Sequence, residues 1–168
     1  EIWFKDDKKH RDDIDPDTGL TLPAEIFDDG SKCWWKDGKK YRDDIDPETG
    51  ITLHASIWDD GTNFWYKDGK KHRNDIDPDT GLTLPAEIYI NGIKVWYKEG
   101  KIHLDQLHPE TGITLHAIIM ENGTKYWLKN EKKHRDDIDP ATGITLPAQI
   151  CSNGNKYWFK NGILFSPK

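Results

Sequence analysis

Short acidic segments with carboxylates at alternate positions are the residues best suited to chemistry in this chain. The first of them is Asp12-Asp13-Ile14-Asp15-Pro16-Asp17-Thr18-Gly19. Alternate carboxylates open many calcium-binding loops, because a hard cation prefers several oxygen ligands. The candidate calcium ligands in all such segments are Asp13, Asp15, Asp17, Asp44, Asp46, Glu48, Asp75, Asp77, Asp79, Asp137 and Asp139.

A turn is the other interpretation of these segments, and we favour it. An EF-hand loop needs Gly at its sixth position and an acid at its twelfth, where this chain has Thr18 and Ala24. A later copy also replaces two of the carboxylates, by Gln106 and His108. In a turn, Pro fixes φ, Asp caps the backbone and Gly takes the positive-φ position. The sequence therefore predicts no cofactor, with calcium in some loops as the alternative.

Histidines and nucleophiles give weaker signals of chemistry. One set of histidines recurs at a constant spacing, and Tyr41 takes its place once, which favours packing over catalysis; this set is His10, His72, His103 and His134. His108 adds a possible cluster with His103 and Asp105, although the spacing matches no standard zinc pattern. No serine lies in a nucleophile-elbow motif, and no phosphate-binding glycine loop is present. We therefore predict that the protein is not an enzyme.

The chain that must position these residues is periodic, with one unit recurring every 31 residues. Prolines show the period at Pro16, Pro47, Pro78, Pro109 and Pro140. Tryptophans show it at Trp3, Trp34, Trp65, Trp96, Trp127 and Trp158. We predict one repeat domain, 1–168, with copies at about 3–33, 34–64, 65–95, 96–126 and 127–157 and a partial terminal copy or cap at 158–168. The first copy starts within an expected strand, which suggests a piece of a longer array.

The residue pattern within each unit predicts β-structure. Residues 20–26 alternate apolar and other side chains, as expected of a strand that is an edge or bulged at Pro23. Turn sequences such as Asn91-Gly92 and Asp68-Gly69 separate this strand from an aromatic strand and a short third strand. The predicted fold class is all-β: a tandem array of five 31-residue β-meander repeats stacked into an elongated sheet or β-solenoid. The tryptophans are expected to form a structural ladder along it.

Two segments of the unit carry a resemblance. Trp65–His72 reads W-Y-K-D-G-K-K-H, and residues 84–92 read L-P-A-E-I-Y-I-N-G. They resemble the tandem W-Y-K-[DN]-G-K-x-H-R β-hairpin repeats of bacterial and giant-virus proteins, which are loosely similar to MORN repeats. The resemblance implies an array of β-hairpins used for scaffolding or binding, without a shared catalytic site. The insert between the segments, residues 75–81, is longer than in many such units.

Composition limits the function. The net charge of −6 argues against binding to nucleic acid, and no apolar run is long enough to insert into a membrane. We expect a structural scaffold, part of a longer rod, fibre or filament at a cell surface, outside the cell or in a virion. Its expected partners are further copies of the same repeat. The alternative is a binding module or adhesin that recognises glycans, with calcium in the acidic loops.

Overall fold

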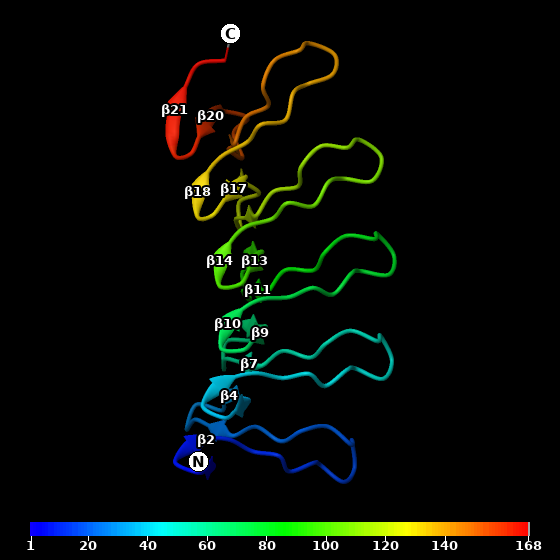
Figure 1. The fold of residues 1–168 in the computed structure, drawn as a ribbon, viewed down its shortest axis with the longest axis vertical. Helices are drawn as coiled ribbons and strands as arrows, with labels where there is room; N and C mark the ends of the chain where they lie inside the picture. Colours follow the sequence, from blue (N-terminus) through cyan, green and yellow to red (C-terminus); the bar gives the residue numbers. More distant parts are fainter. Residues whose placement is uncertain (168) are drawn as a thin grey trace.

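The computed structural model describes residues 1–167, and within them the protein is entirely β-structure and turns. Nothing in this range forms a helix of the length and apolarity needed to cross a membrane. The two ends of the chain lie at opposite ends of the long axis of the molecule (Figure 1). The predicted all-β class is confirmed.

A long antiparallel sheet of 11 strands runs the length of the molecule. Its strand order follows the chain without crossover, because each strand pairs with the one before it and the one after it in the sheet. The strands are β3 (Glu25–Ile26), β4 (Lys32–Cys33), β7 (Ser56–Ile57), β8 (Asn63–Phe64), β11 (Glu87–Ile88), β12 (Lys94–Val95), β15 (Ile118–Ile119), β16 (Lys125–Tyr126), β19 (Gln149–Ile150), β20 (Lys156–Lys160) and β21 (Ile163–Phe165).

Five two-stranded hairpins form a second column beside this sheet. They are β1 (Phe4–Lys5) with β2 (Lys8–Lys9), β5 (Trp35–Lys36) with β6 (Lys39–Lys40), β9 (Tyr66–Lys67) with β10 (Lys70–Lys71), β13 (Tyr97–Lys98) with β14 (Lys101–Ile102), and β17 (Leu128–Lys129) with β18 (Lys132–Lys133). The turn residues Asp68 and Gly69 both have positive φ, 51° and 77°, as the tight turn of a two-residue hairpin requires.

The acidic segments form arms that project from the opposite side to these hairpins (Figure 1). Each arm is a narrow loop closed by one bridge, such as Ile14 with Thr21. The arms span residues 12–22, 43–53, 74–84, 105–115 and 136–146.

The core is a narrow line between the sheet and the roots of the arms. Its centre is a row of alanines with at most 1% exposure: Ala24, Ala55, Ala86, Ala117 and Ala148. Trp34, Trp65 and Trp127 are buried beside them. The predicted strand over residues 20–26 is shorter than expected, because only Glu25 and Ile26 pair as a strand. Pro23, which has no N–H to donate, separates this strand from the arm.

A substitution in the hairpin turn at Asn130-Glu131 tests the requirement for positive φ in these turns. Glu131 has φ of 67°, in the left-handed region that costs a side chain about 1 kcal/mol. Most equivalent turns have Gly at this position. We expect Glu131→Gly to raise the free energy of unfolding by about 0.5–1 kcal/mol, measured by urea denaturation. Lys132→Gly, one residue on in the strand, is the control and should lower it; equal effects would contradict this account of the turn.

Candidate functional site

A recurring polar cluster joins each copy to the one before it, and Trp65 lies at its centre. The indole N–H of Trp65 donates to the backbone carbonyl of Thr52 over 2.8 Å. A buried indole needs such an acceptor, and here the previous arm supplies it. The same bond recurs from Trp34 to Thr21, Trp96 to Thr83, Trp127 to Thr114 and Trp158 to Thr145.

Arg73 covers the Trp65 ring from the outside. Its guanidinium carbon lies 3.8 Å from the ring centroid, close enough for a cation–π interaction. Its Nε donates to Asp75 over 2.7 Å, and its Nη1 donates to the carbonyl of Pro85 over 3.2 Å. One side chain therefore holds an aromatic ring, an arm carboxylate and a main-chain carbonyl.

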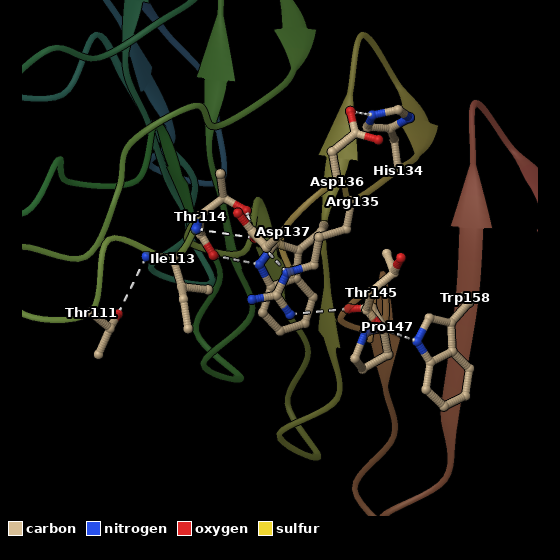
Figure 2. Close-up of polar contacts among 11 residues, drawn as sticks. Thr111, Ile113, Thr114, His134, Arg135, Asp136, Asp137, Thr145, Pro147 and Trp158 are labelled. Carbon is tan, nitrogen blue, oxygen red and sulfur yellow. Dashed lines mark hydrogen bonds and ion pairs between the residues drawn. The ribbon is translucent and has the colours of Figure 1, made fainter. Parts of the chain in front are cut away.

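The arm carboxylate closes the cluster by binding the preceding arm. Asp75 accepts a hydrogen bond from the hydroxyl of Thr52. We name Thr52, Trp65, Arg73, Asp75 and their equivalents the inter-copy cluster. Figure 2 shows a later example, where Arg135 contacts Asp137 and Thr114 approaches the same carboxylate.

Asp44 shows the electrostatic effect of this arrangement. Burial alone would disfavour its charged form. Hydrogen bonds from Thr21 and Arg42 outweigh that effect and hold the pKa of the carboxyl below its ordinary value. In this copy the cluster therefore keeps Asp44 ionised and paired with Arg42.

The fourth copy builds the same junction without charges. Leu104 and Gln106 replace the arginine and aspartate. The side-chain oxygen of Gln106 accepts the N–H of Thr83 over 2.6 Å, and its amide donates to the carbonyl of Gly81 over 3.1 Å. Trp96, which has no arginine over it, is half-buried rather than buried.

The first histidine set braces the hairpin turns. The Nδ1 of His10 accepts the N–H of Asp37, a positive-φ turn residue of the next copy, over 3.1 Å. His72, His103 and His134 accept the N–H groups of Glu99, Asn130 and Asn161 in the same way. An imidazole that accepts at Nδ1 carries its proton on Nε2, and the Nε2 of His134 lies 2.6 Å from Asp136. This supports the packing interpretation of these residues.

A second histidine pair lies inside the tryptophan row. The ring of His54 makes edge-on contacts with Trp34 and Trp65, at centroid distances of 6.1 and 5.8 Å. His116 lies in the same way between Trp96 and Trp127. Burial, aided by nearby cations, lowers the pKa of both histidines to about 4. The ladder in these copies therefore alternates indole and neutral imidazole.

A buried carboxylate, Glu87, is a feature that the sequence reasoning missed. It is 1% exposed, lies 3.0 Å from the Nζ of Lys71 and accepts a hydrogen bond from the hydroxyl of Tyr89. Burial and this carboxylate raise the pKa of Tyr89 to about 12 and also raise that of Tyr97. Its signal lay in the recurring pair Lys9 with Glu25 and Lys71 with Glu87. The fourth copy exchanges both residues, for Ile102 and Ile118, whereas the second and fifth copies keep the lysine and have Ser56 and Gln149.

The structure divides the predicted calcium ligands into three groups. Asp13, Asp44, Asp75 and Asp137 pair with arginines at the arm roots. Asp15, Asp46, Asp77 and Asp139 cap backbone N–H groups within the arm turns. Asp17, Glu48 and Asp79 are exposed at the arm tips.

The capping role accounts for the turn chemistry of the arms. Asp46 accepts the N–H groups of Glu48 and Thr49 over 2.9 and 3.0 Å, and these bonds lower its pKa. In the fourth copy His108 takes this place and accepts the N–H of Glu110. Across residues 1–167, no three His, Cys, Asp or Glu side chains are grouped closely enough to hold a metal ion.

Shallow pockets lie over the inter-copy clusters. One of about 230 Å³ is lined by Trp65, Arg73 and His72, and another of about 230 Å³ is lined by Trp127, Arg135 and His134, 62 residues on. Both are smaller than the 300–1,000 Å³ usual for small-molecule sites. No known protein family matches the chain, and no curated protein is significantly similar to it in sequence.

Replacing one member of the inter-copy cluster tests its cohesion. Arg73→Leu leaves the half-buried Asp75 carboxylate without its cation, so we expect it to lower the free energy of unfolding by about 2–3 kcal/mol. Arg73→Leu with Asp75→Gln reproduces the residues of the fourth copy and should lower it by less than about 1 kcal/mol. Urea denaturation of both variants measures the two changes in the free energy of unfolding. A double variant as unstable as the single one would show that the two residues act independently.

The histidines between tryptophans predict a pH dependence. Below pH 6.5 the unfolded chain protonates His54 and His116, whereas the folded chain does not until about pH 4. Stability should therefore fall as pH decreases through this range, by about 1 kcal/mol per histidine at pH 5 after allowance for partial exposure.

The matched variant carries His54→Pro and His116→Pro, the residue found at Pro23, Pro85 and Pro147 in the other copies. Its urea midpoint should change less between pH 7 and pH 5 than that of the original chain. The remaining histidines are present in both proteins, so equal changes would contradict the assignment.

Proposed function

We propose that the protein is a structural scaffold in which five 31-residue copies stack into an open, rod-like sheet. The observation that carries this proposal is the inter-copy cluster, which recurs at successive junctions of the chain. An array of this kind lengthens by adding copies, without any change to the existing junctions.

Two further rows of bonds support the stacking. On the hairpin side, the N–H of Gly69 donates to the carbonyl of Lys40 in the previous hairpin over 3.1 Å. In the turns that join successive strands of the long sheet, the N–H of Asp59 donates to the hydroxyl of Ser31 in the previous copy over 3.0 Å. The arm and hairpin bonds recur along the array, and the turn bond recurs from Ser152 to Thr124, so neighbouring copies are held at more than one place, which favours a stiff array.

Most of the candidate metal ligands already bind other groups of the protein, which also supports a structural role. Eight of the 11 candidate calcium ligands bind arginines or backbone amides, and the first histidine set braces turns. A rod, fibre or filament at a cell surface, outside the cell or in a virion would use such an architecture directly. Its partners would be further copies of the same repeat.

Small-angle X-ray scattering tests the shape. Ten strand spacings of about 4.8 Å give an array roughly 50 Å long, with about 10 Å for each copy. We expect a radius of gyration of about 18 Å, against about 15 Å for a compact domain of this length. A value near 15 Å would overturn the proposal.

Deletion of residues 65–95, one whole copy, tests the modular stacking independently. The shortened chain joins Phe64 to Trp96, the residue equivalent to Trp65. We expect it to fold, with the longest dimension reduced by about 10 Å. A deletion of residues 65–80, which interrupts an arm, is the control and should not fold cooperatively.

A further inference from the structure

Charge is segregated across the width of the molecule. We name the five arms the arm edge, and the six segments 4–9, 35–40, 66–71, 97–102, 128–133 and 159–164 the hairpin edge. The arm edge holds 16 carboxylates and no Lys or Arg, whereas the hairpin edge holds 15 lysines and 6 carboxylates. The two edges lie on opposite sides of the array (Figure 1). Three hairpin-edge lysines reach carboxylates at the arm roots, in the pairs Lys5–Asp12, Lys98–Asp105 and Lys160–Asp136. The remaining charges leave the arm edge negative and the hairpin edge positive.

Each edge presents a row of charges that the chain itself leaves unneutralised. On the hairpin edge the row is Lys8, Lys39, Lys70, Lys101 and Lys132, all exposed. On the arm edge the row is Asp17, Glu48, Asp79 and Glu110, also exposed. Within residues 1–167 none of these side chains forms an ion pair. Like charges repeated at a constant spacing repel one another unless an opposing row neutralises them.

Grooves lie between successive hairpins and match the arms in spacing. Three consecutive gaps hold open grooves of about 300, 500 and 410 Å³. The largest is lined by Lys67, Lys70 and Lys98 together with Asp68 and Glu99. Lysines outnumber carboxylates in this groove and in the one beside Lys101, whereas the groove beside Lys39 holds two of each. These three grooves follow one another at the spacing of one copy, as the arm tips do, so three arm tips of a second molecule would meet them in register.

The arms also expose an aliphatic row that has no cover within the chain. Its members are 49–52% exposed: Ile14, Ile45, Ile76, Leu107 and Ile138. The aliphatic stems of lysines can cover such side chains while their ammonium groups remain in water. The aliphatic stem of Lys70, for example, lies beside Gly100 in the turn of the next hairpin. Its Cβ is 3.4 Å from the position that a side-chain carbon on Gly100 would occupy. The hairpin edge thus offers apolar stems as well as positive charge.

We propose that the arm edge of one molecule docks on the hairpin edge of a second copy of this chain, with the acidic tips in the lysine-lined grooves. The contact joins two different surfaces, so it leaves a free arm edge and a free hairpin edge at either side and continues into a lateral array of rods. This proposal rests on the rod-like scaffold proposed above. It identifies the partner as the protein itself and names the surfaces that meet.

The chemistry favours a second copy over an unrelated polyanion. A flexible polyanion would be attracted by the hairpin edge and repelled by the arm edge, with nothing to set its spacing. A second copy brings carboxylates at the spacing of the grooves together with the aliphatic row. Single exposed ion pairs are weak, but several engage at once along each edge, and their strength adds through multivalency.

Sedimentation velocity with charge-reversed variants tests this proposal. The arm variant carries Glu48→Lys, Asp79→Lys and Glu110→Lys, and the hairpin variant carries Lys39→Glu, Lys70→Glu and Lys101→Glu. All six positions are exposed. At about 20 mM salt, where the Debye length is long, the original chain should form species that grow with concentration, and about 0.5 M salt should return it to monomers. Each variant alone should remain monomeric, and an equimolar mixture of the two should regain association.

A matched control reverses three carboxylates outside both edges, with Asp28→Lys, Asp59→Lys and Glu121→Lys. It changes the net charge as much as the arm variant does, and it should still associate. Monomeric behaviour of the original chain at low salt up to about 1 mM would overturn the docking. So would association of either reversed variant alone, or a mixture that stays monomeric. Scattering from the monomeric samples reports the rod shape separately, so elongated monomers that never associate would remove the docking and leave the scaffold standing.

Discussion

The hydrogen bond from each buried indole to a carbonyl of the preceding arm is the interaction on which the rest of the structure depends. Trp65 cannot be buried without an acceptor, and that acceptor, Thr52, belongs to the neighbouring copy. Arg73 then shields the ring and draws in Asp75, which in turn binds Thr52. The core of a single copy is therefore closed only when a neighbour is present. Two-residue strands bury too little surface to be stable alone, and this junction explains how such short strands persist in a long sheet.

Paired replacements show which of these contacts the fold can exchange. Where the arginine becomes Leu104, the aspartate becomes Gln106, and the glutamine bonds the backbone that the aspartate side chain bonds elsewhere. Where the lysine becomes Ile102, the glutamate position becomes Ile118. A buried charge that loses its partner costs several kcal/mol, whereas exchange of both partners is nearly neutral. Both exchanges occur in the same copy, which builds its junction with neutral groups.

The sequence predicted the strand and turn chemistry well, because these depend on local residues. The Asp-Pro-x-Thr-Gly turn is an example, since Asp46 caps amides only two and three residues away. The inter-copy cluster could not be predicted, because it joins residues of different copies. Thr21 and Asp44 are 23 residues apart, and no local preference brings them together. The strand expected over residues 20–26 begins only at Glu25, and the copies with His54 and His116 in place of the proline have the same two-residue strand, so the proline does not set this limit. The indole ladder was expected without the imidazoles of His54 and His116 that lie within it.

A single spacing governs both the interior and the two edges of this molecule. Stacking requires each copy to present the same groups at the same height, so every charge becomes a row of like charges. In the interior, Arg and Asp rows lie side by side and neutralise each other, as Arg42 and Asp44 do over 2.7 Å. At the edges the lysine row and the tip carboxylates are on opposite sides of the array and cannot meet within one molecule. The repulsion along each row can be relieved by counterions or by an opposing row of equal spacing. In the docking that we propose, another array of the same repeat supplies an opposing row at that spacing, because the same stacking sets the spacing of both rows.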